Sequence, residues 1–362
     1  MQALVTSELA GGAVAPSRAL RSPWLVSRRY DLAFLVGNAA IVPVSLVAIA
    51  LGLSGDLFDA AVTALIGGPH IFVTLSSAAA NKSFRARHPV ALPIAALIPV
   101  AVVWLSLSHY QILISLFLGA ASFHVLQQAA YLSDIYRSRS RVVEPRSSRF
   151  VDHGLIFTAM YPVALYKIAR GDFFMAGVQV LRPPFLTMPV VYLEWAAFAA
   201  FAAAWTWKTA GEARRGSLNR PKTLLIALTA VLSFVISGVT DREHMGLAFQ
   251  SMNAWHSMQY LGLVWALRTT RTDGDLGPVS RRLAGQRGPV WFYAGNVAIA
   301  LVLFFVTKAF ADWNPLRVTE GQNYYMFVLS PLLVHYFLDG VAFLDRVPKL
   351  APLAPVPRPA AT

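Results

Sequence analysis

Long apolar runs separated by short polar segments dominate this sequence. About ten runs of roughly 17 to 25 mostly apolar residues recur, which is the length that a helix needs to cross a membrane. No connecting segment exceeds about 25 residues, which leaves no room for a separate soluble domain. The pattern predicts an all-α fold, a polytopic membrane helix bundle with about ten transmembrane helices, at 31–53, 57–79, 90–107, 109–133, 153–168, 190–207, 222–240, 244–267, 290–310 and 325–344.

The two ends of the chain differ from these runs. Residues 1–30 contain no signal-peptide-like apolar segment before Pro23, so they predict a flexible cytoplasmic tail. Residues 347–362 predict a disordered tail, because closely spaced prolines prevent a helix there. We expect residues 31–346 to form one transmembrane domain.

Composition and charge support a membrane location. The chain is 56% hydrophobic and 14% charged, with a mean hydropathy of +0.53. A net charge of +13 is also typical of nucleic-acid binding, but here the basic residues occur in short clusters between apolar runs. With a cytoplasmic N-terminus, 25 of the 31 Lys and Arg residues fall on the inner side. We therefore expect a bacterial inner-membrane protein with both termini in the cytoplasm and no nucleic-acid partner.

The histidines are the main candidates for chemistry. The chain has no cysteine, so a bound metal must be held by His, Asp or Glu. Four of the eight histidines lie deep in predicted spans that all run inward, about 10 to 15 residues from the outer end. That places them in one layer roughly 8 Å thick near the midplane. Around a single ion, facing nitrogens would lie within roughly 3–4.5 Å of each other. These candidate metal ligands are His70, His124, His256 and His335.

Each of these histidines has a polar residue four positions later, on the same helix face. A metal-binding imidazole donates its second nitrogen to an oxygen that fixes its orientation, and these residues are placed to accept that bond. Asp339 follows His335 in this way and is either its partner or a ligand itself. The alternative is that each histidine only hydrogen-bonds to a neighbouring helix. The i+4 residues are Thr74, Gln128, Tyr260 and Asp339, of which Asp339, Tyr260 and Gln128 are the candidate catalytic residues.

The remaining histidines carry weaker signals. His153 opens the fifth predicted span and is a fifth candidate, either as a metal ligand or as part of a proton path from the cytoplasm. The alternative is that Asp152 caps the helix and His153 occupies its first turn. His88, His109 and His244 lie in a loop or at helix ends and are interpreted as interfacial residues.

Two further features flank the candidate ligands. The sequence Gly67-Gly68-Pro69 predicts an interruption of the helix just before His70, and irregular backbone at that depth is tolerated only when it is buried or lines a cavity. Polar residues also recur along the span that carries His256. This stripe is either hydrogen-bonding glue between helices or the wall of a polar cavity, and it comprises Gln250, Asn253, Ser257 and Tyr260.

The motifs around these histidines resemble those of a known family. In order, they are Gly-Gly-Pro-His (67–70), Ser-Phe-His (122–124), Asp-His-Gly (152–154), Trp-His-Ser (255–257) and His335 with Leu338-Asp339. They resemble the Brp/Blh family of bacterial membrane β-carotene dioxygenases over most of residues 60–345. The resemblance implies non-haem iron held by His70, His124, His256 and His335, supported by Asp339, which activates dioxygen to oxidise or cleave a polyene.

The chain departs from the family pattern at several positions. Ile71 stands where the family has glycine, Gln127 and Gln128 replace an acidic pair, and Val334 replaces a proline. The chain is also longer, with extra spans. These departures favour a divergent relative that acts on a different lipid.

The leading hypothesis is therefore a membrane oxygenase, with histidine-bound iron, dioxygen and a hydrophobic isoprenoid or lipid substrate that enters from the bilayer; carotenoid cleavage is one such reaction. A second hypothesis is a transporter or proton-coupled permease, because intramembrane His and Asp also build proton relays. A third is a haem b protein in which pairs of histidines bind the haem.

Overall fold

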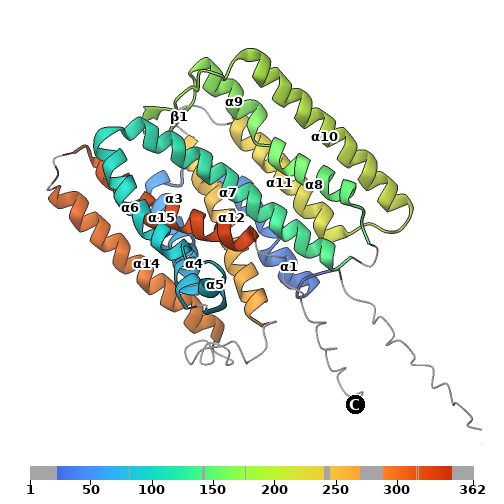
Figure 1. Ribbon diagram of the computed structural model, residues 1–362, viewed down its shortest axis with the longest axis horizontal. Coiled ribbons are helices and arrows are strands. Elements are labelled where there is room, and N and C mark those ends of the chain that lie inside the picture. Colours follow the sequence, from blue (N-terminus) through green and yellow to red (C-terminus); the bar gives the residue numbers. More distant parts are fainter. Residues whose placement is uncertain are drawn as a thin grey trace, which may run out of the picture.

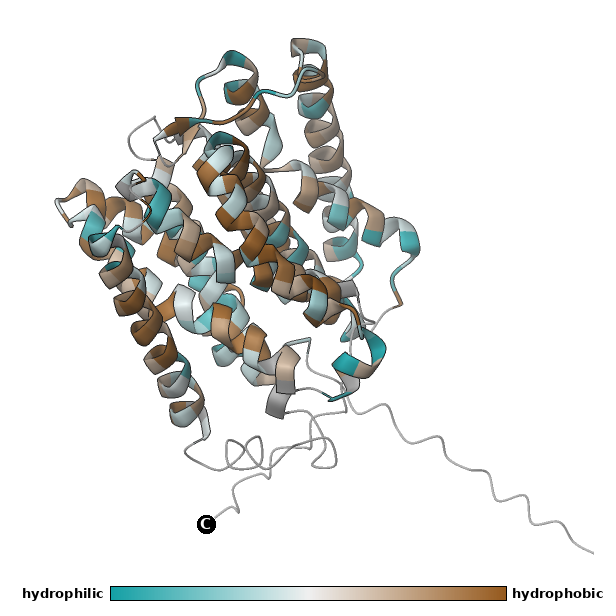
Figure 2. Ribbon diagram, turned by 60° about the vertical axis from the view of Figure 1, so that its left-hand side comes forward, coloured by the Kyte–Doolittle hydropathy of each residue, from teal (hydrophilic) through white to brown (hydrophobic). Residues whose placement is uncertain are grey.

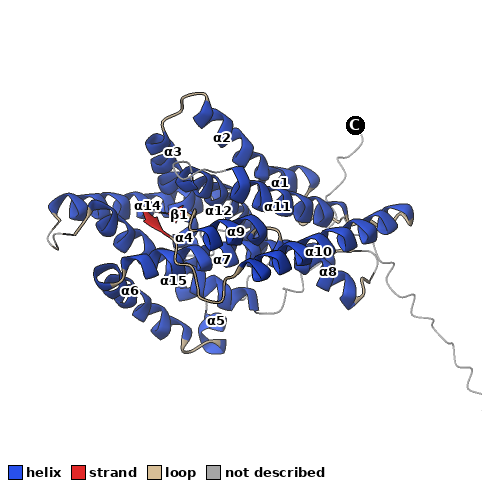
Figure 3. Ribbon diagram, turned by 90° about the horizontal axis from the view of Figure 1, so that it is seen from above, coloured by secondary structure: helices blue, strands red, loops and turns tan. Residues whose placement is uncertain are grey.

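The computed structural model describes residues 23–80, 82–140, 143–175, 177–239, 245–269, 288–314, 316 and 318–344. Figure 3 shows that these residues are almost all helical, apart from one short antiparallel hairpin of β1 (Phe174–Met175) and β2 (Val178–Gln179). The all-α prediction is confirmed. The helical elements are α1 Arg28–Phe34, the 3-10 helix η1 Gly37–Ala40, α2 Ile41–Ala50, α3 Gly55–Val62, the π-helix η2 Thr63–Gly67, α4 Gly68–Ala80, α5 Lys82–Arg87, α6 Ala91–Ser108, α7 Tyr110–Ser138, α8 Arg146–Thr158, α9 Tyr161–Arg170, α10 Met188–Arg214, α11 Arg220–Val239, α12 Met245–Thr269, α14 Gly288–Trp313 and α15 Glu320–Leu344.

Eight helical segments among the described residues are long and apolar enough to cross a membrane. Long hydrophobic stretches run along the helices in Figure 2. This composition indicates an integral membrane protein. The eight segments match eight of the ten predicted spans and are Arg28–Ala50, Gly55–Ser76, Ala91–Ser108, Tyr110–Ser138, Met188–Arg214, Arg220–Gly238, Val290–Phe310 and Gly321–Phe343.

The other two predicted spans differ from these eight for physical reasons. Helix α12 has 25 residues, but its polar stripe makes it less apolar than the eight. The predicted span at 153–168 is divided between α8 and α9, of 13 and 10 residues, which meet at a turn. Together, α8 and α9 still run the length of the bundle. Asp152 in α8 pairs with Lys222 at the start of α11, whereas Phe173 after α9 packs with Met245 at the start of α12.

The bundle has two distinguishable ends. Helices α3, α7, α12 and α15 all begin at one of them, which we call the Asp59 end. There the Cβ position of Gly55 approaches Leu247, and the rings of Tyr110 and Tyr325 lie 6.4 Å apart. At the other end, called the Lys222 end, α7 stops and α8 and α11 begin. The common direction predicted for the four histidine helices is thus confirmed.

Helices α4, α7, α12 and α15 lie together in the bundle. In Figure 1 they occupy the middle of the view, with α14 and α10 at opposite edges. Helix α15 packs against α6, α7, α4 and α14, and α12 packs against α2 and η2. Every one of the four central helices carries one candidate ligand, so their packing decides whether the histidines meet.

The packed domain begins earlier than the predicted boundary at residue 31. Leu25 is buried, and its backbone N–H donates to Asp31 Oδ2 over 2.6 Å. Tyr136 donates to the same oxygen over 2.9 Å, and Arg139 donates to the Leu25 carbonyl over 2.6 Å. These bonds satisfy a fully buried carboxylate and tie the segment before α1 to the end of α7.

A cluster of paired charges closes the Lys222 end. Asp152 is fully buried and accepts hydrogen bonds from Arg137 over 2.9 Å, from Lys222 over 3.0 Å and from Lys208. Helix α8 begins at Arg146, six residues before Asp152. The helix-cap interpretation of Asp152 is therefore wrong, because the sequence pattern did not show that α8 starts before the apolar run.

Reporter fusions test the predicted topology. If the inner side carries most of the basic residues, fusions after residues 22 and 344 should both report a cytoplasmic location. A periplasmic signal from either fusion would contradict the orientation. A fusion in the loop between α2 and α3, at the Asp59 end, serves as the opposite-side control and should report the periplasm.

Candidate metal centre

The four predicted histidines converge. One ring nitrogen from each of them lies within 4.8 Å of the others. His70, His124, His256 and His335 are all at most 3% exposed. This limit of 4.8 Å is close to the separation of roughly 3–4.5 Å that is expected between nitrogens around one ion.

Local backbone features place His70 in the centre. The Gly-Gly-Pro motif predicted that the helix before His70 would be interrupted. The helix instead continues without a break and widens into the π-helix Thr63–Gly67. Pro69 has no N–H, so it cannot bond to the carbonyl of Leu65, and Tyr293 of α14 donates to that oxygen instead. Gly68 allows α14 to approach, because a Cβ there would lie 2.6 Å from the Cβ of Ala300.

The imidazole rings pack edge to face. Ring centroids are 4.2 Å apart for His70 and His335, 4.8 Å for His124 and His256, and 4.8 Å for His124 and His335, with interplanar angles of 75–78°. Such angles turn ring edges, where the nitrogens lie, towards a shared point. The rings therefore meet as a group and do not face separate helix interfaces or lipid.

The ring nitrogens lack protein partners. Of the eight nitrogens, seven have no hydrogen bond; only His335 Nδ1 has one. A buried polar atom without a partner costs about 1–3 kcal/mol, so a cluster of seven is costly, and a metal ion that binds one nitrogen of each ring would satisfy four of them. Four neutral imidazoles with a nearby carboxylate form a donor set that suits iron, zinc or copper.

A chain of hydroxyl groups fixes the tautomer of His335. Thr74 donates to Tyr260 over 2.7 Å, and Tyr260 donates to Asp339 Oδ1 over 2.7 Å. Each hydroxyl has one proton, so Thr74 can only accept from His335 Nδ1, 2.8 Å away. His335 therefore carries its proton on Nδ1, and the lone pair of its Nε2, which has no protein partner, is available to a ligand.

The residues four positions after the histidines lie at the site, but they bond to residues of other helices and not to the histidine of their own helix. Thr74 contacts His335 and leaves the ring of His70 unbonded. Asp339 Oδ2 has no hydrogen bond and lies 3.6 Å from His335 Nδ1 and 4.0 Å from His124 Nε2. The expectation that each residue would bond to the histidine of its own helix is wrong, because the bonds run between helices.

Gln128 has a different environment from the one predicted. Its side-chain amide donates to the backbone carbonyl of His256 over 3.1 Å and to Gln259 Oε1 over 2.9 Å. Gln259 in turn donates to the Leu35 carbonyl over 2.6 Å. Gln128 thus holds α7 against α12 beside the centre, and its catalytic role stays a prediction.

The other histidines lie apart from the centre. His153 is at the Lys222 end, where its Nε2 lies 3.2 Å from Asp134 Oδ1. It is not one of the four converging residues, so its prediction as a fifth ligand finds no support; a role in proton transfer stays a prediction. His88 is half-buried and His109 is exposed at the junction of α6 and α7, whereas His244 lies outside the described residues.

Two aromatic residues of the site were not predicted. Tyr336 and Phe343 of α15 stack on His124, with centroids 4.5 and 6.1 Å away and interplanar angles of 28° and 24°. Phe343 also lies 4.9 Å from the ring of Tyr131 on α7. These half-buried rings cover one side of the centre between α7 and α15. Aromatic residues are common along the chain, so no local signal distinguished these two.

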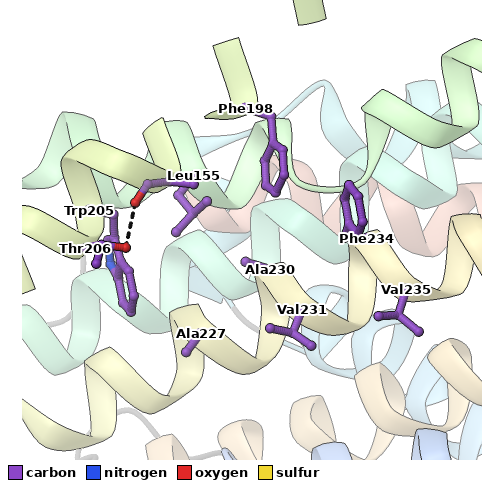
Figure 4. A pocket seen from close by; sticks show the side chains of 10 residues that line it. Leu155, Phe198, Trp205, Thr206, Ala227, Ala230, Val231, Phe234 and Val235 are labelled. Carbon is purple, nitrogen blue, oxygen red and sulfur yellow. Dashed lines mark hydrogen bonds between the residues drawn. The ribbon is translucent and has the colours of Figure 1, made fainter. Parts of the chain in front are cut away.

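A separate apolar groove of about 280 Å³ lies away from the histidines. No titratable side chain lines it, and Leu126 and Ala129 of α7 pack behind it against α8 and α11. It is therefore an apolar groove between α8, α10 and α11 and not part of the centre. Figure 4 shows its lining, which consists of Leu155, Phe198, Ala202, Trp205, Thr206, Ala227, Ala230, Val231, Phe234 and Val235.

No protein-family model, curated protein or solved structure matches this chain. The resemblance to the membrane β-carotene dioxygenases therefore depends on the motif residues alone.

Proposed function

We propose that the protein is a membrane metalloenzyme whose His70, His124, His256 and His335 bind a transition metal. The single observation that carries this proposal is the convergence of four buried imidazoles whose nitrogens are almost all unpaired. Hydrogen bonding between helices explains a single membrane histidine, but it does not explain four rings that face each other and have one protein hydrogen bond among them.

We further propose that the metal is non-haem iron and that the reaction is the oxidation of an isoprenoid or related lipid, with carotenoid cleavage as one candidate. The donor set is compatible with iron, and the motif resemblance favours it over zinc or copper. Histidine-bound iron supplies dioxygen activation at an open coordination position.

The side chains around the centre have three roles in this proposal. The chain from His335 through Thr74 and Tyr260 to Asp339 orients one ligand and holds its proton on Nδ1. The rings of Tyr336 and Phe343 exclude water from His124 and offer flat apolar surfaces to an unsaturated chain arriving from the bilayer. The oxygen Asp339 Oδ2, free of hydrogen bonds, is available to accept a proton.

The packing favours this proposal over the two alternatives. Haem b would need a flat slot between two axial histidines, whereas His70 is in edge contact with His335, His256 and Tyr260, with centroids 4.2 to 5.0 Å away. A proton-coupled permease needs titratable residues along a path, whereas these four histidines meet at one point.

Labelled dioxygen tests the proposed reaction. Membranes from cells that produce polyene isoprenoids, with the protein loaded with Fe²⁺, should transfer ¹⁸O from ¹⁸O₂ into an isoprenoid product detected by mass spectrometry. The variant His256→Ala should transfer none, and the variant His109→Ala, altered at an exposed histidine, should behave like the wild type. Iron-loaded wild-type protein that labels no isoprenoid in these membranes would overturn the oxygenase assignment.

A further inference from the structure

Burial of the four histidines raises the question of how a metal ion reaches them. The rings are at most 3% exposed, and the helices around them are apolar over most of their length. Moving a divalent cation through apolar packing is very costly, because its hydration shell must be replaced by other polar groups. A route to the centre therefore needs a continuous series of polar side chains.

The direction of the Lys222 end is closed. Val73, Tyr260 and Phe292 form a buried cluster just beyond the histidines, and Trp265 and Phe343 pack against it. The polar chain of Gln128 and Gln259 also leads this way, but it ends at the carbonyl of Leu35, which is fully buried.

Apolar packing also blocks a polar route along two of the central helices, α7 and α15, in the direction of the Asp59 end. Before His124, α7 presents Leu113, Phe117 and Ala121 to a buried apolar cluster. Before His335, α15 adds Leu329 and Leu332 to the same cluster. Apart from the tyrosines Tyr110 and Tyr325 at the Asp59 end and Tyr336 beside His335, the residues that these two helices add to the cluster are apolar.

A row of polar side chains leads from α12 to the Asp59 end. Ser257, next to His256, donates to Asn253 Oδ1 over 3.1 Å, and Asn253 donates to Gln250 Oε1 over 3.1 Å. Gln250 then donates to Thr63 Oγ1 over 3.0 Å and to the Asp59 carbonyl over 3.4 Å. Asp59 is half-buried in α3 and accepts a bond from Tyr324 over 3.5 Å. We call Ser257, Asn253, Gln250, Thr63 and Asp59 the polar row.

The backbone beside the polar row is adapted to it. The π-helix Thr63–Gly67 runs along the row, and such local widening of a helix is often found at functional sites. A Cβ at Gly67 would lie 3.2 Å from Asn253 Nδ2, so the absence of a side chain gives this amide its space. The amide and hydroxyl oxygens of the row are ligands that can replace water around a divalent cation.

We propose that the polar row is the loading route by which a divalent transition-metal ion passes from the Asp59 end to the four histidines. This inference rests on the metal centre of the proposed function. The row accepts the ion at the Asp59 carboxylate and passes it along oxygen ligands to His256. It sets the rate of metal uptake and contributes nothing to the final coordination.

Cobalt uptake separates rate from affinity. Chelator-treated full-length protein in detergent is mixed with Co²⁺, and its absorption bands are followed in a stopped-flow instrument. Asn253→Leu should slow uptake at least about tenfold, because it removes from the middle of the polar row an oxygen ligand that replaces water around the passing ion. The final amount of bound cobalt and its spectrum should match the wild type. Thr63→Val, which keeps the side-chain volume, should also slow uptake.

The control is Gln259→Leu, which removes a more deeply buried amide from the same helix, outside the polar row. It should load cobalt at the wild-type rate. Equal rates in Thr63→Val, Asn253→Leu and the wild type would overturn the loading route, and so would equal slowing in Gln259→Leu. Wild-type protein that binds no cobalt at all would instead overturn the metal centre itself.

Discussion

Replacement of His335 by alanine is expected to remove most of the bound metal. Among the four candidate ligands this residue alone has a hydrogen-bonded neighbour that fixes its tautomer, and its Nε2 has no protein partner. Its loss should lower metal affinity by more than the roughly 10- to 100-fold that follows from loss of an outer hydrogen-bond partner. Metal content per chain, measured by mass spectrometry after dialysis against a weak chelator, provides the readout.

The same loss is expected for alanine at His70, His124 or His256, because each contributes one of the four converging nitrogens. His109→Ala is the matched control, since His109 is exposed at the end of α6 and should leave metal content unchanged. If all four variants of the centre retain metal as well as this control does, the ion is bound elsewhere and the assignment of the ligands is wrong.

Replacement of Asp339 by asparagine should weaken metal binding by roughly 10- to 100-fold, because Asp339 anchors the hydroxyl chain that orients His335. Asparagine keeps the side-chain volume but places an NH₂ group where Oδ2 faces His335 and His124, 3.6 and 4.0 Å away. A donor then faces the N–H that His335 carries on Nδ1. Competition titration with a chelator of known affinity measures the change.

Two variants show whether Asp339 acts through the hydroxyl chain. Tyr260→Phe interrupts the chain and should weaken metal binding in the same direction, whereas Asp312→Asn changes an exposed carboxylate of α14 and should have no effect. Unchanged affinity in Asp339→Asn would return Asp339 to a purely structural role. A loss of binding in Asp312→Asn would mean that general destabilisation explains both results.

Much of the fold follows from hydrophobic periodicity. The apolar runs located every long helix, because a segment that must satisfy its backbone in a membrane has no regular alternative to a helix or a closed barrel. The start of the domain was harder to predict. The burial of Leu25 depends on Asp31, Tyr136 and Arg139, which come together only in the folded bundle.

The common depth of the histidines was sufficient to predict their convergence, since helices of one direction place residues of equal depth in one layer. Their hydrogen-bond partners were not predictable in the same way. The i+4 rule describes neighbours on one helix, whereas Thr74 bonds to His335 and Tyr260 bonds to Asp339 across helix contacts. Those contacts depend on how each helix is rotated against the next, which side-chain packing decides.

The position of Asp152 illustrates the same limit. From the sequence it precedes an apolar run and looks like a helix cap, but in the folded chain it is a buried anion that Arg137, Lys208 and Lys222 neutralise. These four charges come from four different helices, α7, α8, α10 and α11, so no local pattern links them. Burial of such a group is tolerable only because its partners are all in place.

X-ray absorption at the metal edge of the purified wild-type protein tests the central claim most directly. Protein supplied with Fe²⁺ during purification should retain at least one ion per chain. Its spectrum should fit nitrogen ligands at about 2.0–2.2 Å, with the outer-shell scattering of several imidazoles. A protein that retains no iron, zinc, copper or cobalt, or whose bound metal shows no imidazole scattering, would contradict the assignment of His70, His124, His256 and His335 as ligands.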